Sequence, residues 1–319
     1  MAKLAPIPRR EDLLAQVDRA NVAAARWVVV QILLCGLFGW LIDWHQVLDA
    51  PITAAVAAAV VVGPQLMSLL HYMATQRKEI DDLKEQTRFG NFDKHRLRYL
   101  VNDTLHRLGL PLPGPPVYIT ADRTLNASAM NVGLAAFFRS LNGVYLNRQV
   151  LHRLTPAEVQ DIIGHELGHY FRYYLLSDRC RGLTLLMGAL ACVLVTQWVD
   201  MEGMFAYVAL MIVGTATWFV SGLLGAGTGE AVEYLCDDLG AQVHGVVTSI
   251  NGLLKLGADG EMQTAIYHQQ LVHRKHDNIN TADVVEAINQ AIPYGYTNQE
   301  ELERAVHDAL ERHRRKPGK

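Results

Sequence analysis

Residues 155–169 read TPAEVQDIIGHELGH, and this stretch carries the signals for one helix around which the fold is built. Thr155 and Glu158 form a capping-box pattern with proline at the first helical position, so we expect the helix to begin at Pro156. Apolar residues then recur at helical spacing. Because side chains four positions apart share one face of a helix, His165 and His169 are predicted to lie side by side.

Two histidines placed in this way can both bind one Zn²⁺ at about 2.0–2.1 Å. Glu166 follows the first of them and points toward a water on the same metal, which is the role of the general base in metallopeptidases with this pattern. The alternative is a surface helix with two solvated histidines. Gly164 and Gly168 argue against it, since each costs the helix about 1 kcal/mol relative to alanine. That cost is easier to explain if another part of the protein approaches the helix closely.

The composition predicts a membrane protein. Of the 319 residues, 50% are hydrophobic and 19% charged, with a net charge of −3; soluble proteins carry about 25% charged residues. No Lys or Arg occurs between Trp27 and Gln76, or between Gly182 and Leu254. Buried core helices could also explain these windows. Each window holds two apolar stretches that approach the ~20 residues needed to cross a bilayer: 27–42 and 52–70, then 183–199 and 204–224.

The charges around these stretches predict their orientation. The connections at 43–51 and 200–203 are short, so both pairs should be tight hairpins, and they carry acidic residues but no Lys or Arg. Arginines instead flank the hairpins, for example Arg26, Arg77 and Arg181. By the positive-inside rule, both termini and the polar domain face the cytosol. The first 25 residues contain no apolar run, so we expect an uncleaved first span in a multi-pass protein of the cell (inner) membrane.

We therefore predict a mainly α membrane protein, with four transmembrane helices in two hairpins plus a cytosolic α+β catalytic domain that has a small edge sheet. The second hairpin interrupts this polar domain without dividing it into two folding units. The predicted segments are the cytosolic N-terminus (1–26), the first hairpin (27–76), the first part of the polar domain with the zinc helix (77–181), the second hairpin (182–227) and the second part with the C-terminal helices (228–319).

A catalytic zinc site needs a third protein ligand and one open position. After the second hairpin, residues 230–238 read EAVEYLCDD, a composition that suggests a helix leaving the membrane. Glu233 and Asp237 share one face of it. The glutamate could bind zinc while the aspartate accepts the N–H of a ligating histidine and fixes its tautomer. Glu230 lies on the same face and could be the ligand instead, and a solvated acidic patch is the alternative to any metal role.

The zinc motif, the hairpin after it and the segment Glu233-Tyr-Leu-Cys-Asp237 together resemble the HtpX-type membrane metallopeptidases and the related CAAX prenyl-protein endopeptidases. The resemblance extends over roughly residues 27–245. It implies a zincin-like fold of the gluzincin type. In that fold Glu233, and not Glu230, completes the zinc site, and Asp237 supports a ligating histidine.

The resemblance also places Asn126 and Ala127 on a strand beside the active site, between strands predicted at 116–120 and 143–146. Such an edge strand could pair with the backbone of an extended substrate. An ordinary turn asparagine is the alternative.

The sequence departs from this family at three places. Cys236 stands where alanine is usual and is small enough to belong to the core, and Val232 stands where arginine is common. The family's downstream His-Pro is missing: His273 and His276 lie in the right region, but neither precedes a proline. Oxyanion stabilisation is therefore unassigned, and a solvated basic segment is the alternative role for these histidines. From Thr281 onward we expect two further helices.

Together these features predict a membrane-embedded zinc endopeptidase that cleaves membrane or membrane-associated proteins at the cytosolic face, with Zn²⁺ as cofactor and Glu166 as general base. We expect an extended peptide substrate and the bilayer as partners, and no nucleic acid. One rival is a site-2-type intramembrane protease, although the charges near the zinc helix would cost several kcal/mol in hydrocarbon. The other rival is a non-catalytic membrane scaffold or chaperone that retains a zincin fold.

Overall fold

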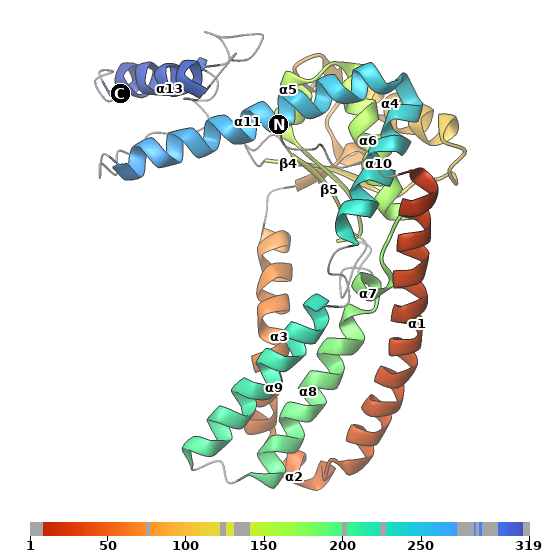
Figure 1. Cartoon of the computed structure of the whole chain (residues 1–319), viewed down its shortest axis with the longest axis vertical. Coiled ribbons are helices and arrows are strands. Elements are labelled where there is room, and N and C mark those ends of the chain that lie inside the picture. Colours follow the sequence, from red (N-terminus) through yellow and green to blue (C-terminus); the bar gives the residue numbers. More distant parts are fainter. Residues whose placement is uncertain are drawn as a thin grey trace, which may run out of the picture.

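The computed structural model describes residues 9–74, 77–121, 126–130, 141–199, 203–223, 228–272, 284, 287–288 and 299–314. This part of the chain is mostly helical and elongated (Figure 1). Four apolar helices lie side by side at one end and form the apolar bundle. A small sheet and the remaining helices form the other end, the globular half.

The apolar bundle consists of α1 (Arg10–Leu41), α3 (Pro51–Ala74), α8 (Arg181–Trp198) and α9 (Met204–Leu223), with the short α2 (Trp44–Asp49) between α1 and α3. Helix α8 is central, because it packs against α1, α3 and α9. By length and composition, α1 and α8 could each cross a membrane. The apolar stretches in α3 and α9 are shorter, at Pro51–Met67 and Met204–Val220. Two of the four predicted stretches therefore meet the criterion for a span among the described residues.

Helix α1 begins far ahead of the apolar stretch predicted at 27–42. Its first turns run beside α7 (Leu176–Arg179) and α10 (Gly229–His244), and Val17 is buried in the core of the globular half. One continuous helix thus joins the two ends of the molecule.

The sheet of the globular half has the strand order β1 (Arg77–Glu79), β4 (Val117–Thr120), β6 (Gly143–Asn147) and β5 (Ala127–Met130). Strands β4 and β6 are parallel, whereas β1 and β5 pair antiparallel with their neighbours. The strands predicted at 116–120 and 143–146 are therefore confirmed as β4 and β6. A second, two-stranded sheet contains β2 (Arg88–Phe89) and β3 (Phe92–Asp93).

Helix α6 (Pro156–Phe171) occupies the centre of the globular half. It begins at Pro156 as predicted: Thr155 N–H donates to the Glu158 carboxylate at 2.8 Å, and Glu158 N–H donates to the Thr155 hydroxyl at 3.3 Å. Helices α4 (Lys94–Arg107), α10 and α11 (Val246–Val272) pack against it. Leu97, Leu146, Leu167 and Leu235 are fully buried in their common core.

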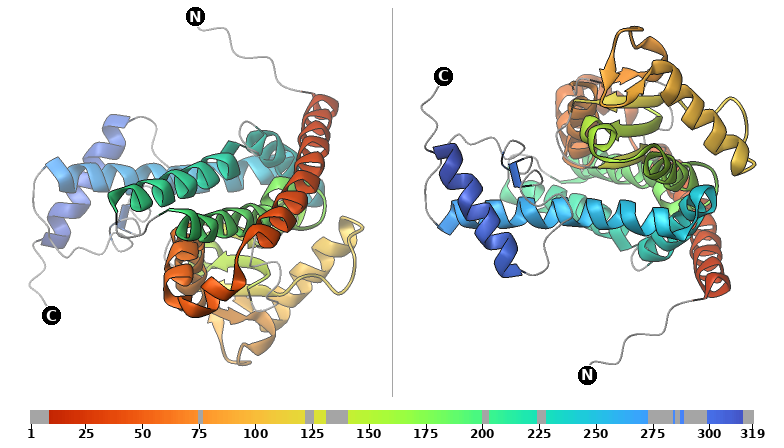
Figure 2. Two further views of the ribbon diagram at one scale, coloured as in Figure 1. Left: turned by 90° about the horizontal axis from the view of Figure 1, so that it is seen from below. Right: turned by 90° about the horizontal axis from the view of Figure 1, so that it is seen from above.

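The C-terminal end has a second, separate apolar core. It joins the far part of α11 to α13 (Gln299–Arg314) through Met262, Ile266, Leu302 and Val306. Figure 2 shows α13 lying across the far end of α11, on the side of the molecule opposite the start of α1. Of the two C-terminal helices that the sequence predicts, α13 is observed, and the other falls mostly outside the described residues.

Candidate metal centre

The centre is built where α6 and α10 cross at very short range. A Cβ added to Gly164 would lie 3.1 Å from Gly240 Cα, and one added to Gly168 would lie 2.9 Å from Cys236 Sγ. On the other helix, a Cβ at Gly240 would lie 2.7 Å from the Asp161 carbonyl oxygen. The close approach inferred from the two glycines of the motif is therefore present, and Cys236 is a fully buried core residue as expected from its size.

This packing brings His165, His169 and Glu233 together, with one ligand atom from each within 4.8 Å of the others. The two histidine Nε2 atoms are 3.1 Å apart. Glu233 Oε2 lies 3.3 Å from Nε2 of His165, and Oε1 lies 3.5 Å from Nε2 of His169. Ligands at 2.0–2.1 Å in a tetrahedron around zinc are separated by about 3.3 Å. The donor types and their spacing therefore fit a tetrahedral Zn²⁺ with one open position.

Asp237 stands behind the first histidine, as the spacing on the helix predicts. Its Oδ1 lies 2.8 Å from Nδ1 of His165, so that Nδ1–H donates to the carboxylate and Nε2 faces the other two residues, where it can bind a metal once its own proton has left. Glu230, the other candidate on α10, instead accepts a hydrogen bond from the Tyr234 hydroxyl at 2.9 Å. The structure thus brings Glu233, and not Glu230, to the two histidines.

The electrostatics of the group favour a cation at its centre. Burial opposes charge on His165, but hydrogen bonds to Asp237 and Glu233 outweigh it and raise the pKa of this histidine to about 10. Hydrogen bonds from His165 and His169 in turn hold the pKa of Glu233 well below its usual range. Carboxylates that hold a proton on an imidazole so strongly also favour a divalent cation in its place.

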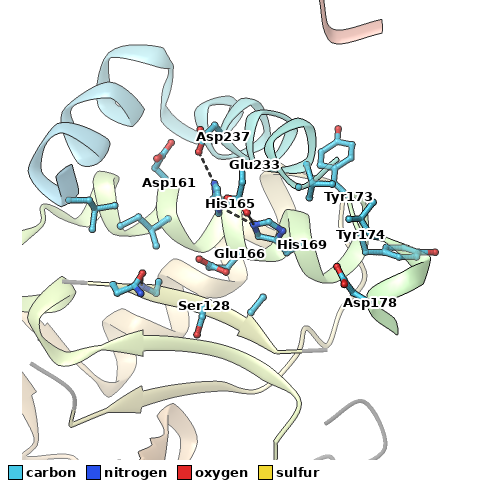
Figure 3. Close-up of a pocket in the computed structure, with 18 of the residues that line it drawn as sticks. Ser128, Asp161, His165, Glu166, His169, Tyr173, Tyr174, Asp178, Glu233 and Asp237 are labelled. Carbon is cyan, nitrogen blue, oxygen red and sulfur yellow. Dashed lines mark hydrogen bonds and ion pairs between the residues drawn. The ribbon is translucent and has the colours of Figure 1, made fainter. Parts of the chain in front are cut away.

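Glu166 lies between this group and the sheet, as Figure 3 shows. Its side chain is almost entirely buried, with 7% of the residue exposed, and burial raises its pKa. The backbone N–H of Ala129 on β5 donates a hydrogen bond to its carboxylate. A glutamate with a raised pKa beside a metal site is suited to exchange protons near neutral pH.

A cleft of about 550 Å³ runs past these residues. Strand β5 forms one wall through Ala127, Ser128 and Ala129, and Asn126, which directly precedes the strand, continues this wall, so both residues expected beside the site line the cleft. Asn147 N–H of β6 donates to the Asn126 carbonyl at 3.1 Å. Because antiparallel pairing alternates, the backbone groups of Ala127 and Ala129 face away from β6, toward the cleft. The Asn126 side chain accepts from Ala127 N–H at 2.8 Å.

Several cleft residues were not anticipated from the sequence. Asp161 precedes His165 by one turn of α6, so helical periodicity could have suggested it, whereas Tyr173 lies just beyond the end of this helix. Tyr173 hydroxyl accepts a hydrogen bond from Arg10 of α1 at 3.2 Å. Leu253 and Leu256 of α11 and Asp178 of α7 also line the cleft, and no local pattern marks them. His273 and His276 lie outside the described residues.

Two comparisons with known proteins give matches. The chain is similar to a protein named Protease HtpX from Chromohalobacter salexigens, with 24% identity over 190 residues that cover 54% of this chain. The matched segment spans 59% of that protein's length. No solved structure matches the chain. The sequence model of peptidase family M48 matches residues 92–285, which make up more than half of the chain. The matched segment contains α6, β5 and α10. The chain therefore belongs to peptidase family M48.

Proposed function

We propose that this protein is a zinc-dependent endopeptidase that acts at a membrane surface. The observation that carries the proposal is the convergence of His165, His169 and Glu233, with the buried Glu166 beside them in a cleft that has a strand as one wall. Membership of a peptidase family and similarity to a protein named as a protease support it.

In this proposal the two histidines and Glu233 hold the metal, and Asp237 orients His165 through its Nδ1–H. A bound Zn²⁺ supplies a Lewis acid that polarises the scissile carbonyl and lowers the pKa of a water molecule to about 7. The short helix crossing at Gly164 and Gly240 fixes α10 on α6, so that the three ligands are held by two rigid elements.

Glu166 carries the proton transfers. Its carboxylate takes a proton from the attacking water and then delivers it to the leaving amine. The Ala129 N–H holds that carboxylate toward the cleft. Burial keeps bulk water away from it and raises its pKa toward the working pH, which is the condition for efficient general-base catalysis.

The substrate pairs with β5 as an additional strand. The outer edge of β5 is paired with no other described strand, and its Ala127 and Ala129 face the cleft. The main-chain groups of an extended peptide can hydrogen-bond there irrespective of its sequence. Ala127 N–H is held by Asn126 in the free protein, so an incoming peptide carbonyl replaces that contact.

The apolar bundle anchors the enzyme in the membrane. We propose that α3 and α9 also cross the bilayer, which gives four spans in two hairpins at 27–76 and 182–227. The catalytic domain, 77–181 with 228–319, and both termini then face the cytosol, as the flanking arginines indicate. Helix α6 lies outside the bundle in Figure 1, which favours a site at the membrane surface over one within the bilayer.

The first prediction tests this function with the Glu166→Gln variant, which keeps the shape of the side chain but removes the base. We expect zinc content equal to that of the native protein and a loss of about 10²–10⁴-fold in peptide cleavage. Zinc is measured by mass spectrometry on the detergent-purified chain, and cleavage with fluorogenic peptides. Glu233→Ala should lose zinc, whereas the matched Glu230→Ala should keep both zinc and activity.

Retained proteolysis in a zinc-loaded Glu166→Gln protein would discard the general-base assignment. Native protein that binds zinc but cleaves no peptide or membrane protein would favour the non-catalytic scaffold instead.

A further inference from the structure

The cleft differs chemically on the two sides of the metal centre. Figure 3 shows Asp161 on one side of His165 and His169, and Tyr173, Tyr174 and Asp178 on the other. The first flank lies under α11 and is otherwise apolar, through Ile162, Leu253 and Leu256. The second flank is formed by α7 and the turn before it, and it is aromatic and charged.

The acidic residues of the two flanks have different surroundings. Asp161 is 5% exposed and lies within the packing between α6 and α11, where its Oδ1 has no hydrogen-bond partner among the described residues. Asp178 is half-buried, and its carboxylate makes no hydrogen bond or ion pair with any described residue. Burial raises the pKa of Asp178, and only the charge of Arg181 opposes this. The group is therefore a partly desolvated acid without a bound cation, in the wall of the cleft.

The neighbouring arginines are held elsewhere. The Arg179 guanidinium donates to the Tyr170 carbonyl at 2.9 Å and stacks on the Tyr174 ring, 3.3 Å from its centroid. The Arg181 guanidinium lies 5.3 Å from the ring centroid of Trp218 on α9. A cationic side chain of a bound substrate can therefore pair with the Asp178 carboxylate.

Asp178 lies at the end of the cleft nearest the apolar bundle. Helix α7 ends at Arg179, and α8, which could cross a membrane, begins at Arg181. Figure 1 shows α7 directly above the end of α8. A polypeptide that reaches this flank from the bilayer presents its juxtamembrane residues, and on the cytosolic side these are enriched in Lys and Arg.

We propose that Asp178 selects a Lys or Arg of the substrate on the α7 side of the scissile bond. This inference rests on the proposed function, because it requires an active endopeptidase with its cleft toward the cytosol. The accessible residues of the α11 flank are apolar, so we expect no preference for charged substrate residues on that side of the scissile bond.

The test uses the detergent-purified full chain and a peptide library in which each position on either side of the cleaved bond is Lys, Ala or Glu. At one of the varied positions, native protein should cleave peptides with Lys about tenfold faster than peptides with Ala. This is the difference expected for one charge-assisted hydrogen bond in a half-buried site. Asp178→Asn should abolish this ratio, and Asp178→Lys should reverse it in favour of Glu. Selectivity on the other side of the cleaved bond should not change.

Asp82→Lys is the matched control, because it makes the same charge change at an exposed residue that does not line the cleft. The Lys/Ala ratio is independent of the amount of active enzyme, and the zinc content of each variant shows that its site is assembled. An Asp178→Asn protein that keeps the Lys preference would overturn the inference, as would an Asp82→Lys protein that loses it. Native protein that cleaves no peptide refutes the proposed function itself, whereas active protein without charge preference refutes only the role of Asp178.

Discussion

The apolar bundle and the globular half of this protein have opposite arrangements of polar and apolar residues. In the globular half, large apolar side chains such as Leu97 and Leu146 are fully buried. In the bundle, Leu33 of α1 is 67% exposed and Phe205 of α9 is 79% exposed, whereas Gln31 is buried and donates to the Thr184 hydroxyl at 2.5 Å. The difference supports the proposal that the two ends have different surroundings, because a large exposed apolar surface marks contact with a membrane or with another protein.

The kind of polar group that each half buries also differs. The polar residues buried in the described part of the bundle are neutral: Gln31, Thr184 and Thr217. The globular half buries the carboxylates of Glu158, Asp161 and Glu166, all of them on α6. Buried charge is costly unless it is paired or used, and among the described residues the buried carboxylates are confined to the helix that carries the candidate metal centre.

The largest change in stability is expected from Gly240→Ala, which disrupts the packing of the globular half. Its Cβ would lie 2.7 Å from a backbone oxygen of α6, and backbone cannot yield as a flexible side chain does. We expect a loss of about 2–3 kcal/mol in the free energy of unfolding, and weaker zinc binding because α10 is displaced. Denaturant unfolding in detergent, followed by near-UV circular dichroism, measures the first effect.

Gly257→Ala is the matched control, since nothing lies within 4 Å of its Cβ position on α11. It should leave stability unchanged or raise it by up to about 1 kcal/mol, through helix propensity alone. Equal effects at the two positions would contradict the close-packed crossing.

A smaller effect is expected from Glu158→Gln, which removes a buried charge from α6. Lys255 Nζ of α11 lies 2.7 and 2.8 Å from the two carboxylate oxygens. Burial raises the pKa of Glu158, but the hydrogen bonds from Lys255 and Thr155 outweigh it, and the pKa is lowered below 4.5. We expect a loss of about 1–2 kcal/mol at pH 7, less than for a fully buried pair because Lys255 is partly exposed.

The sign of the pH dependence follows from the direction of this shift. A lowered pKa means that the ion pair stabilises the fold above pH 4.5, and that this contribution is lost as the pH falls through the folded-state pKa. Thermal melting of the native and Glu158→Gln proteins should therefore differ at pH 7 and converge as the pH falls below the folded-state pKa. A constant difference at all pH values would show that the variant acts through packing, and Lys255→Met should reproduce the pH 7 effect.

The smallest effect is expected from Gln31→Leu in the apolar bundle. Its hydrogen bond to Thr184 joins α1 to α8, and such pairs between membrane helices contribute about 0.6 kcal/mol on average. A double-mutant cycle with Thr184→Val, measured by unfolding in detergent, isolates the pair. A coupling energy above about 2 kcal/mol, or a loss of peptidase activity, would contradict this expectation. It would mean that contacts inside the bundle matter as much for stability and activity as those in the core of the globular half.

Much of the candidate site could be predicted from the sequence because its parts are local. The capping box, the spacing of His165 and His169, and the spacing of Glu233 and Asp237 all lie within single helices, where periodicity fixes which side chains share a face. Periodicity left Glu230 and Glu233 equivalent. The choice between them depends on how α10 is rotated against α6, which the glycine contacts set.

The features that the sequence did not predict are contacts between elements far apart in the chain. Arg10 reaches Tyr173, and Lys255 reaches Glu158, without any local signal at either position. Asp178 reads as one charge among several near a membrane segment until the fold places it in the cleft. The sequence predicted four apolar stretches of similar character, and the structure distinguishes α8 as the one that contacts the other three.

By itself, the sequence determined the helix that carries His165 and His169, the apolar stretches and the strands at 116–120 and 143–146, because each depends on spacing along one short segment. Only the tertiary structure decided how α10 is rotated so that Glu233 faces the histidines, which strand edge faces Glu166 and which acid lies half-buried in the wall of the cleft. These depend on the packing angle and distance between elements. That geometry is fixed by side chains meeting across the core, such as Gly168 against Cys236, and no single segment contains it.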